Sequence, residues 1–243
     1  MGNLFVHTEF QAKDVQQAMK WYGELFGWDT NYMPEMNYAT FSDGRTGGGF
    51  YSNDNYHGTI SYVRVDNYKD TLAKVKDTGG KVIVEPVAME GLGTFAILAD
   101  PEGNCFGIIQ FESNEALPPQ QKQYANFITH IEFRAKDIAK LLDWYAAVFS
   151  WEVNHIPEMH YGMIMTSKDE NAVTGGVSEL GESGPMAIAY IHVDDVDAIW
   201  KKAIENGAKS VSEPSDVPTV GRMAHFSDNN GNVIGLLKYA QPE

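Results

Sequence analysis

Hydrophobic and polar residues alternate along FVHTEF at 5–10, and the spacing becomes helical immediately afterwards. Alternation with a period of two predicts a β-strand. Asp14, with Gln17 three residues later, resembles a capping box at the start of a helix. An apolar stripe at helical spacing and a terminating glycine complete the helix prediction: Val15, Ala18, Met19, Tyr22, Phe26 and Gly27.

The same order of patterns returns further along the first half of the chain. Short strands are predicted in WDTNYM at 28–33, in YATFS at 38–42 and around GGGFYS at 47–52. A strand is then predicted at 59–66 and a helix at 68–78, followed by strands in KVIVEP, TFAILAD and CFGIIQF. The first half is therefore predicted to contain two βαβββ modules.

The chain repeats this half. VHTEFQAKDV at 6–15 matches THIEFRAKDI at 129–138, and an offset of 123 residues also relates Trp21-Tyr22 to Trp144-Tyr145. Further along the offset is 128, which pairs YVRVD at 62–66 with YIHVD at 190–194 and DPEGN at 100–104 with DNNGN at 228–232. A register shared over more than a hundred residues indicates a duplicated gene.

The repeat sets the expected domain organisation. A polar stretch with Pro118-Pro119 predicts a linker at 116–123 between domains at 1–115 and 124–243. The fold class is α+β, with four βαβββ modules in two domains. One module exposes a sheet face, so modules are expected to pair and curl around concave pockets. The pattern leaves open whether they pair within each half or across the halves.

Charge and cysteine content limit the binding partners and the compartment that the sequence predicts. The chain has 18 Lys and Arg against 33 Asp and Glu, a net charge of −15, which disfavours nucleic acid and anionic membranes. A single cysteine, Cys105, fits a reducing compartment, and no secretory signal or membrane helix is predicted. We expect a cytoplasmic monomer or homodimer with a small-molecule ligand.

Three stretches resemble one family. HTEFQAKDVQQAMKWYGELFGW at 7–28, TISYVRVDNYKDTLAKVKDTGG at 59–80 and LADPEGNCFGIIQ at 98–110 are similar to the vicinal oxygen chelate superfamily of glyoxalase I, bleomycin-resistance proteins and extradiol dioxygenases. The second half matches at the same places. The chain resembles in particular bacterial two-domain, glyoxalase-related proteins of unknown substrate.

The resemblance implies four metal-ligand positions in each paired set of modules. His7 and His130 fit the first-strand position, but Ile60 and Ile188 stand at the second-module position. Glycines stand at the others: Gly107 and Gly235, Gly48 or Gly49, and Gly176. One ligand in four remains in each half, whereas open metal sites use about three protein ligands. No cofactor is therefore expected, and a divalent metal is kept as the alternative. The missing glycine side chains would leave room for an apolar or aromatic ligand.

The candidate catalytic residues are His7, Glu9, His130 and Glu132, which strand alternation places on one face with Gln11 and Arg134. Two interpretations remain open. The residues form an internal hydrogen-bond network, or a histidine acts as a general base oriented by the nearby glutamate. In the second case the carboxylate would raise the pKa of the imidazole.

Candidate ligand-binding residues come from the same strands and their neighbours. The second-module strands contribute Tyr62, Arg64, Tyr190 and His192, and Arg134 joins them. The second strands and the PEM turns contribute Trp28, Tyr38, Trp151 and Tyr161, although Pro-Glu is equally typical of a hairpin turn. Arg222 and His225 stand where the first half has Thr94 and Ile97, so any difference in task between the halves is expected there.

The sequence favours a metal-free, glyoxalase-like protein that binds a small organic molecule, by sequestration or with His/Glu acid–base activity of the lyase or isomerase type. The alternatives are a metal-dependent lyase or dioxygenase with a non-standard ligand set, and a scaffold that binds a partner protein.

Overall fold

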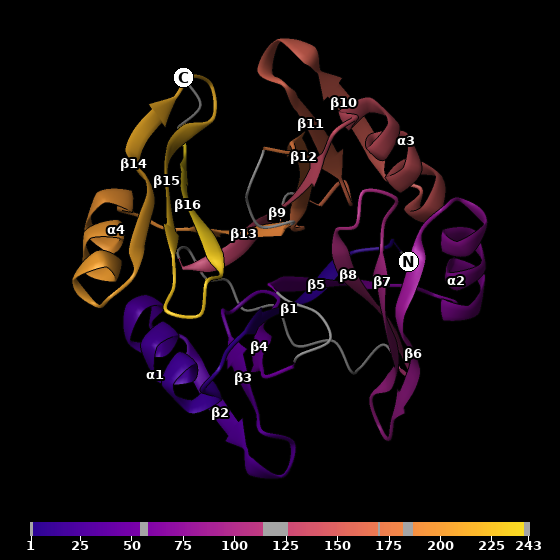
Figure 1. Ribbon diagram of the computed structural model, residues 1–243, viewed down its shortest axis with the longest axis horizontal. Helices are drawn as coiled ribbons and strands as arrows, with labels where there is room; N and C mark the ends of the chain where they lie inside the picture. The colour runs from indigo at the N-terminus through magenta and orange to yellow at the C-terminus, as the bar shows by residue number, and fades with distance from the viewer. Residues whose placement is uncertain (1, 54–57, 114–125, 170, 182–186, 241–243) are drawn as a thin grey trace. The chain divides into compact units, whose positions relative to one another are not determined.

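The computed structural model of the chain (Figure 1) describes residues 2–53, 58–113, 126–169, 171–181 and 187–240. The linker predicted at 116–123 lies outside these residues. Within them the order strand, helix and three strands occurs four times, so the predicted succession of βαβββ modules is confirmed. Over the described part of the chain, no helix has the length and apolarity that crossing a membrane requires.

The first half of the sequence forms two modules. They comprise β1 (Phe5–Gln11), α1 (Val15–Phe26), β2 (Asp29–Met33), β3 (Tyr38–Ser42), β4 (Gly48–Tyr51), β5 (Thr59–Arg64), α2 (Tyr68–Asp77), β6 (Lys81–Met89), β7 (Gly93–Ala99) and β8 (Cys105–Phe111).

The second half repeats them. Its elements are β9 (Phe127–Ala135), α3 (Ile138–Phe149), β10 (Glu152–Ile156), β11 (Tyr161–Met165), β12 (Thr174–Glu179), β13 (Ala187–His192), α4 (Val196–Glu205), β14 (Lys209–Val217), β15 (Gly221–Ser227) and β16 (Val233–Tyr239).

The helix boundaries follow the predicted signals. The Asp14 carboxylate accepts a hydrogen bond from the Gln17 amide (3.0 Å), and Gly27 ends α1 at φ 72°. Asp137 caps α3 in the same way, but Ser150 takes the left-handed position at φ 57°. Glycine adopts this backbone conformation more readily than serine, so the first copy has the less strained helix end.

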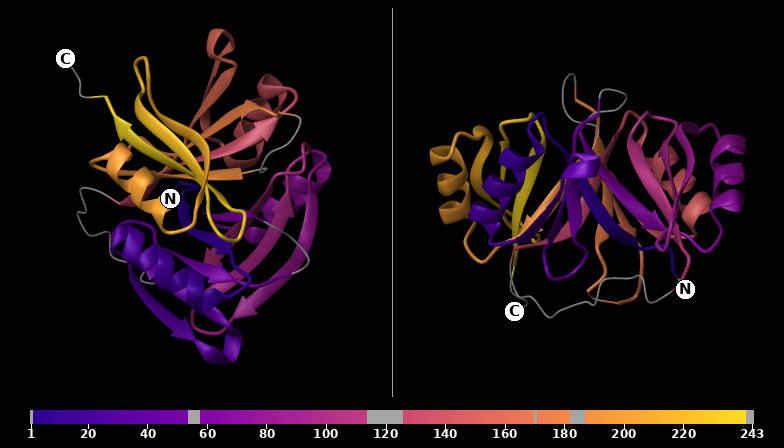
Figure 2. Two further views of the ribbon diagram at one scale, coloured as in Figure 1. Left: turned by 60° about the vertical axis from the view of Figure 1, so that its left-hand side comes forward. Right: turned by 90° about the horizontal axis from the view of Figure 1, so that it is seen from below.

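The strands form two eight-stranded mixed sheets, one from each half of the sequence. Their orders are β2-β3-β4-β1-β5-β8-β7-β6 and β10-β11-β12-β9-β13-β16-β15-β14. The first and last strands of each module pair in parallel, and the neighbouring hairpins are antiparallel. Each helix packs on strands of its own module, as α1 does on β2 to β4 in Figures 1 and 2. The α+β prediction is confirmed.

Dense packing divides the chain into two units, and each unit takes one module from each half. Unit 1 is Met1–His7, Ile60–Pro118 and His130–Ala187, and unit 2 is Thr8–Thr59, Pro119–Thr129 and Ile188–Glu243. Within a unit, modules from different halves therefore share a core. The sequence left open whether modules pair within each half or across the halves, and in both units they pair across the halves.

Two repeated motifs supply hydrogen bonds between modules from different halves. In unit 1, the Tyr145 hydroxyl donates to Asp100 (2.8 Å) and the Asn104 amide donates to the Arg134 carbonyl (2.9 Å). In unit 2, Tyr22 donates to Asp228 (2.9 Å), and Asn232 donates to the Gln11 carbonyl (2.7 Å). The tyrosine of each Trp-Tyr pair and the turn Asp-x-x-Gly-Asn thus join modules from different halves.

Two tryptophans hold the starts of the module-opening strands. The Trp28 indole donates to the Asn126 carbonyl in unit 2, and the Trp151 indole donates to the Asn3 carbonyl in unit 1 (2.5 Å each). Both rings are buried and stacked, Trp28 on Phe41 (4.2 Å between centroids) and Trp151 on Phe149 (4.6 Å). The two predicted ligand-binding tryptophans therefore lie in the hydrophobic cores.

Candidate functional site

Strand alternation places the candidate residues on the face away from the helices. On β9, Phe133 packs against Tyr145 of α3 (5.0 Å), so His130, Glu132 and Arg134 lie on the opposite face. On β1, Phe10 packs against Tyr22 of α1 (5.1 Å), so the neighbouring Glu9 lies on the face away from the helix.

His130 is held by two hydroxyl groups. Its Nδ1 lies 2.6 Å from Thr174 Oγ1, which is directly opposite in the parallel β9–β12 register, and its Nε2 lies 2.7 Å from Tyr161 Oη. Burial lowers the pKa of His130 to about 4, because desolvation disfavours the charged imidazolium. The raised pKa expected for a histidine beside a carboxylate is therefore wrong for His130, whose imidazole is neutral at pH 7.

Glu132 has other partners. It accepts a hydrogen bond from Ser178 (2.9 Å) and forms an ion pair with Arg134 (3.3 Å) while almost completely buried. Arg134 also reaches the Glu179 carbonyl (3.4 Å). The ion pair with Arg134 balances the negative charge of Glu132 on this face.

The equivalent glutamate of the first half has a different partner. Glu9, in unit 2, accepts a hydrogen bond from the Tyr38 hydroxyl (2.9 Å). Tyr38 occupies the position that Tyr161 occupies in the repeat. The tyrosine hydroxyl thus meets a carboxylate in one copy and an imidazole in the other.

His7 belongs to unit 1, where its ring meets the edge of Tyr62 (5.6 Å between centroids, 74°). Tyr62 in turn packs edge-on against Phe95 (6.2 Å). The predicted catalytic residues His7 and Glu9 therefore lie in different units, each beside a tyrosine.

The fourth tyrosine, Tyr190 in unit 2, is hydrogen-bonded to a histidine. His225 Nε2 lies 3.0 Å from Tyr190 Oη, and His225 Nδ1 lies 2.8 Å from Ser212 Oγ. Position 225 is one of the two at which the halves were expected to differ.

Each of the four tyrosines covers a glycine. A Cβ atom at Gly49, Gly107, Gly176 or Gly235 would come under 3.0 Å from Tyr38, Tyr62, Tyr161 or Tyr190, respectively. The expectation that these glycines leave room for a ligand is therefore wrong, because a tyrosine of the chain fills the space. The glycines allow an aromatic ring to lie across the neighbouring strand, a known way of supporting glycine within a sheet.

The remaining predicted cations already have partners. Arg64 is buried and pairs with Asp66 (3.7 Å). Arg222 binds Asp197 through two nitrogens (2.5 and 2.7 Å) and Asp216 through a third (3.1 Å), which raises the pKa of Arg222 and lowers that of Asp197. Arg222 thus links the start of α4 to β14.

His192 lies in a stack of aromatic rings in unit 2, between Phe127 (5.1 Å) and Tyr239 (5.7 Å). Burial lowers its pKa, and its Nδ1 is buried without a hydrogen-bond partner among the described atoms.

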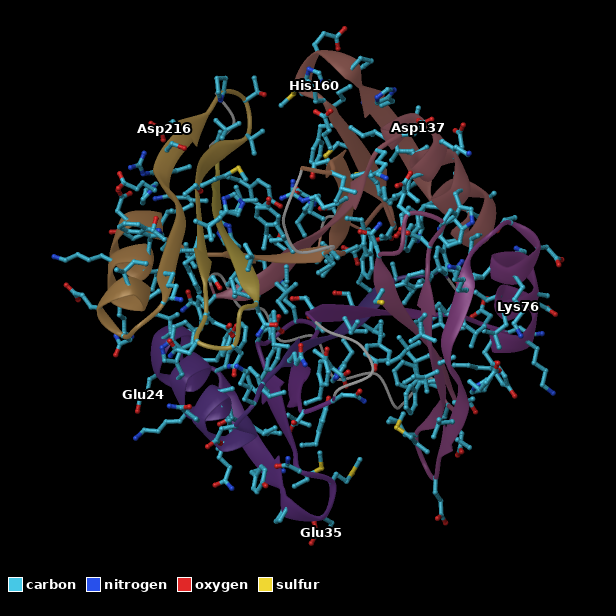
Figure 3. All side chains as sticks on the ribbon, viewed as in Figure 1. Glu24, Glu35, Lys76, Asp137, His160 and Asp216 are labelled. Carbon is cyan, nitrogen blue, oxygen red and sulfur yellow. The ribbon has the colours of Figure 1, made fainter. Side chains whose placement is uncertain are left out.

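The PEM segments are hairpin tips. Pro34–Met36 and Pro157–Met159 form single 3-10 turns between β2 and β3 and between β10 and β11. Glu35 and His160 lie at these tips in Figure 3. The hairpin-turn interpretation is therefore the one that the structure shows for Glu35, whereas Tyr38 and Tyr161 begin the following strands.

The described residues contain no group of three or more His, Cys, Asp and Glu side chains placed to bind one metal ion. His130 uses both ring nitrogens on hydroxyl groups. The donors around the four tyrosines are therefore hydroxyl, imidazole and single carboxylate groups.

Sequence reasoning missed the small hydroxyl residues Thr174, Ser178 and Ser212. Thr174 and Ser178 stand directly opposite His130 and Arg134 in the parallel register, and this register is not encoded in either strand alone. The sequence does contain both members of a covered-glycine pair, Tyr62 and Gly107, but their adjacency depends on the β5–β8 pairing.

The family model of the Glyoxalase/Bleomycin resistance protein/Dioxygenase superfamily matches the chain twice, at residues 4–108 and 127–236. The chain belongs to this superfamily. Its two matches make the protein a tandem repeat of glyoxalase-like domains, as the repeated sequence predicted.

Curated relatives of this superfamily member are similar over nearly their whole length. "Putative glyoxylase CFP32" of Mycobacterium bovis is 26% identical over 96% of this chain and 94% of that protein. "Anthracycline biosynthesis protein DnrV" of Streptomyces peucetius is 25% identical over 93% and 90%.

Solved structures show the shared fold. The Mn(II)-bound glyoxalase from Novosphingobium aromaticivorans superposes with a TM-score of 0.72 at 14% identity, over 98% of this chain and 83% of its own. The 2,3-dioxygenase LapB from Pseudomonas sp. KL28 gives a TM-score of 0.72 at 12% identity, over 100% and 95%. At these identities the likeness concerns architecture only.

Proposed function

We propose that this chain is a metal-independent member of the superfamily that binds a small organic molecule against the tyrosine-bearing faces of its sheets. One observation carries the proposal. At four equivalent places a glycine stands where the family resemblance implies a metal ligand, or next to that place, and a tyrosine covers it. Each tyrosine contacts a histidine or glutamate instead of leaving that residue for a metal.

The donor set does not fit a resident divalent ion. Such an ion at an open site needs about three protein ligands held together, and the described residues supply no group of three. The proposed function therefore uses no metal ion. A metal-dependent lyase or dioxygenase remains the alternative that elemental analysis tests.

The charges favour a neutral or cationic ligand. Arg64 and Arg134 are already neutralised by Asp66 and Glu132, so neither is a free anchor for an anionic group. The net charge of −15 further repels anions at long range. Tyrosine rings supply flat apolar surface with a polar tip, which suits a planar organic molecule that carries hydroxyl or carbonyl groups. The name of the anthracycline-biosynthesis relative supports an aromatic ligand class.

The chemistry open to the protein itself is proton transfer. Because the pKa of His130 is about 4, its imidazole is neutral at pH 7 and takes part in hydrogen bonds with both ring nitrogens. The pair His130–Tyr161 is then able to donate to or accept from an enol or phenol of the ligand. Sequestration uses these hydrogen bonds without turnover, whereas an acid–base activity shifts a proton on the bound molecule. We place this function in the cytoplasm, in a monomer or homodimer.

Metal content is the first test. We expect well below one transition metal per chain in untagged protein purified without chelator, and unchanged ligand binding after treatment with a chelator. Close to one tightly held ion per half, with binding lost on chelation, would replace the proposal by the metal-dependent alternative.

Ligand binding is the second test. Thermal-shift screening should use pairs of planar aromatics that differ only in a carboxylate, and the neutral member should bind better. Tyr161→Phe should weaken that binding about five- to thirty-fold, because it removes one hydroxyl at a cost of about 1–2 kcal/mol. Tyr32→Phe is the matched control, since the Tyr32 hydroxyl bonds Asn37 on an exposed hairpin (3.0 Å). Equal effects of the two variants would contradict the placement of the ligand.

A further inference from the structure

Three polar side chains form a continuous line in unit 2. Tyr190 on β13 is hydrogen-bonded to His225 on β15 (3.0 Å), and His225 is hydrogen-bonded to Ser212 on β14 (2.8 Å). The intervening strand β16 contributes Gly235, which stands beside both Tyr190 and His225 in the register. Because Gly235 has no side chain, the Tyr190 ring crosses β16 and reaches the imidazole.

Solvent exposure increases along this line. Tyr190 is buried, His225 is half-buried and Ser212 is exposed. The β14–β15 ladder shifts register on both sides of Ser212, yet Ser212 itself stands directly opposite His225. The irregular strand therefore brings an exposed hydroxyl to the outer nitrogen of the histidine.

The first half has the same backbone arrangement without the polar line. Tyr62, Gly107, Ile97 and Val84 occupy the equivalent register positions, and the β6–β7 ladder shifts register on both sides of Val84 as well. Two apolar residues of the first half, Val84 and Ile97, thus correspond to Ser212 and His225. Both differences fall on the line of contacts that starts at the tyrosine, and both make that line polar in the second half.

We propose that Tyr190, His225 and Ser212 form a proton relay between the tyrosine-bearing face of the second half and solvent, and that the apolar Val84 and Ile97 interrupt the equivalent line in the first half. A ligand O–H gives its proton to Tyr190 Oη while the tyrosine proton moves to His225 Nε2. The proton on His225 Nδ1 moves to Ser212 Oγ, and the serine proton leaves to water. One proton passes from the ligand to water, so only the ligand O–H bond breaks and the ligand remains as its enolate or phenolate. The reverse sequence returns the proton and restores the starting tautomer of His225. The class of ligand is a weakly acidic enol or phenol.

The role of a ligand rests on the proposed function, but the relay is measurable without one. In a mixture of H₂O and D₂O, the ¹³Cζ signal of a tyrosine splits when its hydroxyl exchanges slowly with solvent and averages when exchange is fast. We expect an averaged signal for Tyr190 and a split one for Tyr62. Tyr190→Phe and Tyr62→Phe assign the two signals among the 12 tyrosines.

The variants follow from the repeat itself. His225→Ile introduces the residue that the first half places at this position. It removes the acceptor of the Tyr190 proton, so exchange of the Tyr190 hydroxyl should slow and its averaged signal should split. Ser212→Val keeps the Tyr190–His225 bond and should slow exchange by less. The double variant V84S/I97H should speed exchange at Tyr62.

Unchanged exchange at Tyr190 in His225→Ile, with native circular dichroism, would overturn the relay. If His225→Ile does not fold, Ser212→Val decides, because its side chain is exposed and its loss leaves the core intact. Failure to find any organic ligand would remove the proposed function while leaving the exchange result standing, so the two failures are distinguishable.

Discussion

Tyr145 and Asp100 come from opposite halves of the sequence and share a buried hydrogen bond of 2.8 Å. Tyr22 and Asp228 form the same bond with the halves exchanged (2.9 Å). Burial and the adjacent carboxylate raise the pKa of both tyrosines, and burial raises the pKa of Asp100. The duplicated motifs therefore stabilise contacts between modules from different halves.

Tyr145→Phe should lower the free energy of unfolding by about 1–3 kcal/mol, because it leaves a buried carboxylate oxygen without one of its donors. Tyr22→Phe should cost a similar amount, and the two effects should add, since the bonds lie in separate units. Urea denaturation followed by circular dichroism measures both. The control Tyr32→Phe removes only an exposed hydrogen bond to Asn37, so it should stay within about 0.5 kcal/mol of the unchanged chain. Losses no larger than in this control would contradict the stabilising role.

His130 should make the protein less stable at low pH. Its pKa is about 4 in the folded chain and near 6.5 when unfolded, so its stabilisation is complete above pH 6.5 and is lost as the pH falls toward 4. The loss from this group is about 3 kcal/mol. Denaturation curves should show a shallower decline over that window in His130→Gln than in the unchanged chain. A pKa near 6.5 or higher, measured for His130 by NMR, would instead support the carboxylate-oriented general base.

Gly107→Ala should destabilise the chain by about 1–3 kcal/mol, because the new methyl group overlaps the Tyr62 ring. The cost should nearly disappear in a Tyr62→Ala background, where the space is empty. A double-mutant cycle from urea denaturation measures this coupling. Gly181→Ala is the matched control, since none of the described atoms lies within 4 Å of the added Cβ there. An equal cost with and without the Tyr62 ring would contradict the packing argument.

The fold was predictable because its determinants are local and repeated. Asp14 and Gly27 mark the helix ends through capping and backbone conformation, and alternation in β1 and β9 separates Phe10 and Phe133 from the polar residues between them. Pairing of modules across the halves depends on long-range contacts such as Tyr145–Asp100. In the sequence, the residues of these contacts appear only as motifs repeated in the two halves. The repeats do not show which residue contacts which.

Strand alternation in the sequence predicts which candidate residues share a face, but not which residues they contact. His130 and Glu132 share one face of β9, as alternation predicts, but their partners Thr174 and Ser178 come from a strand more than 40 residues away. The sequence does not state the register between these two strands. The pKa of His130 followed burial and not the nearby carboxylate, and burial depends on the packing of the whole module. Trp28 and Trp151 have indole N–H groups that bond backbone carbonyls of distant segments, a role without any local pattern.

Glu132→Gln should change ligand preference. Glutamine still accepts the Ser178 hydrogen bond but removes the negative partner of Arg134, whose guanidinium then carries an unbalanced charge. A carboxylated aromatic should consequently bind about tenfold more tightly, while its neutral analogue should be little affected. Isothermal titration of both ligands measures the ratio, and Glu152→Gln serves as the control because it breaks only an exposed ion pair with Lys168 (3.9 Å). If the ratio does not move, or moves equally in the control, the Glu132–Arg134 pair does not set the charge preference of the bound molecule.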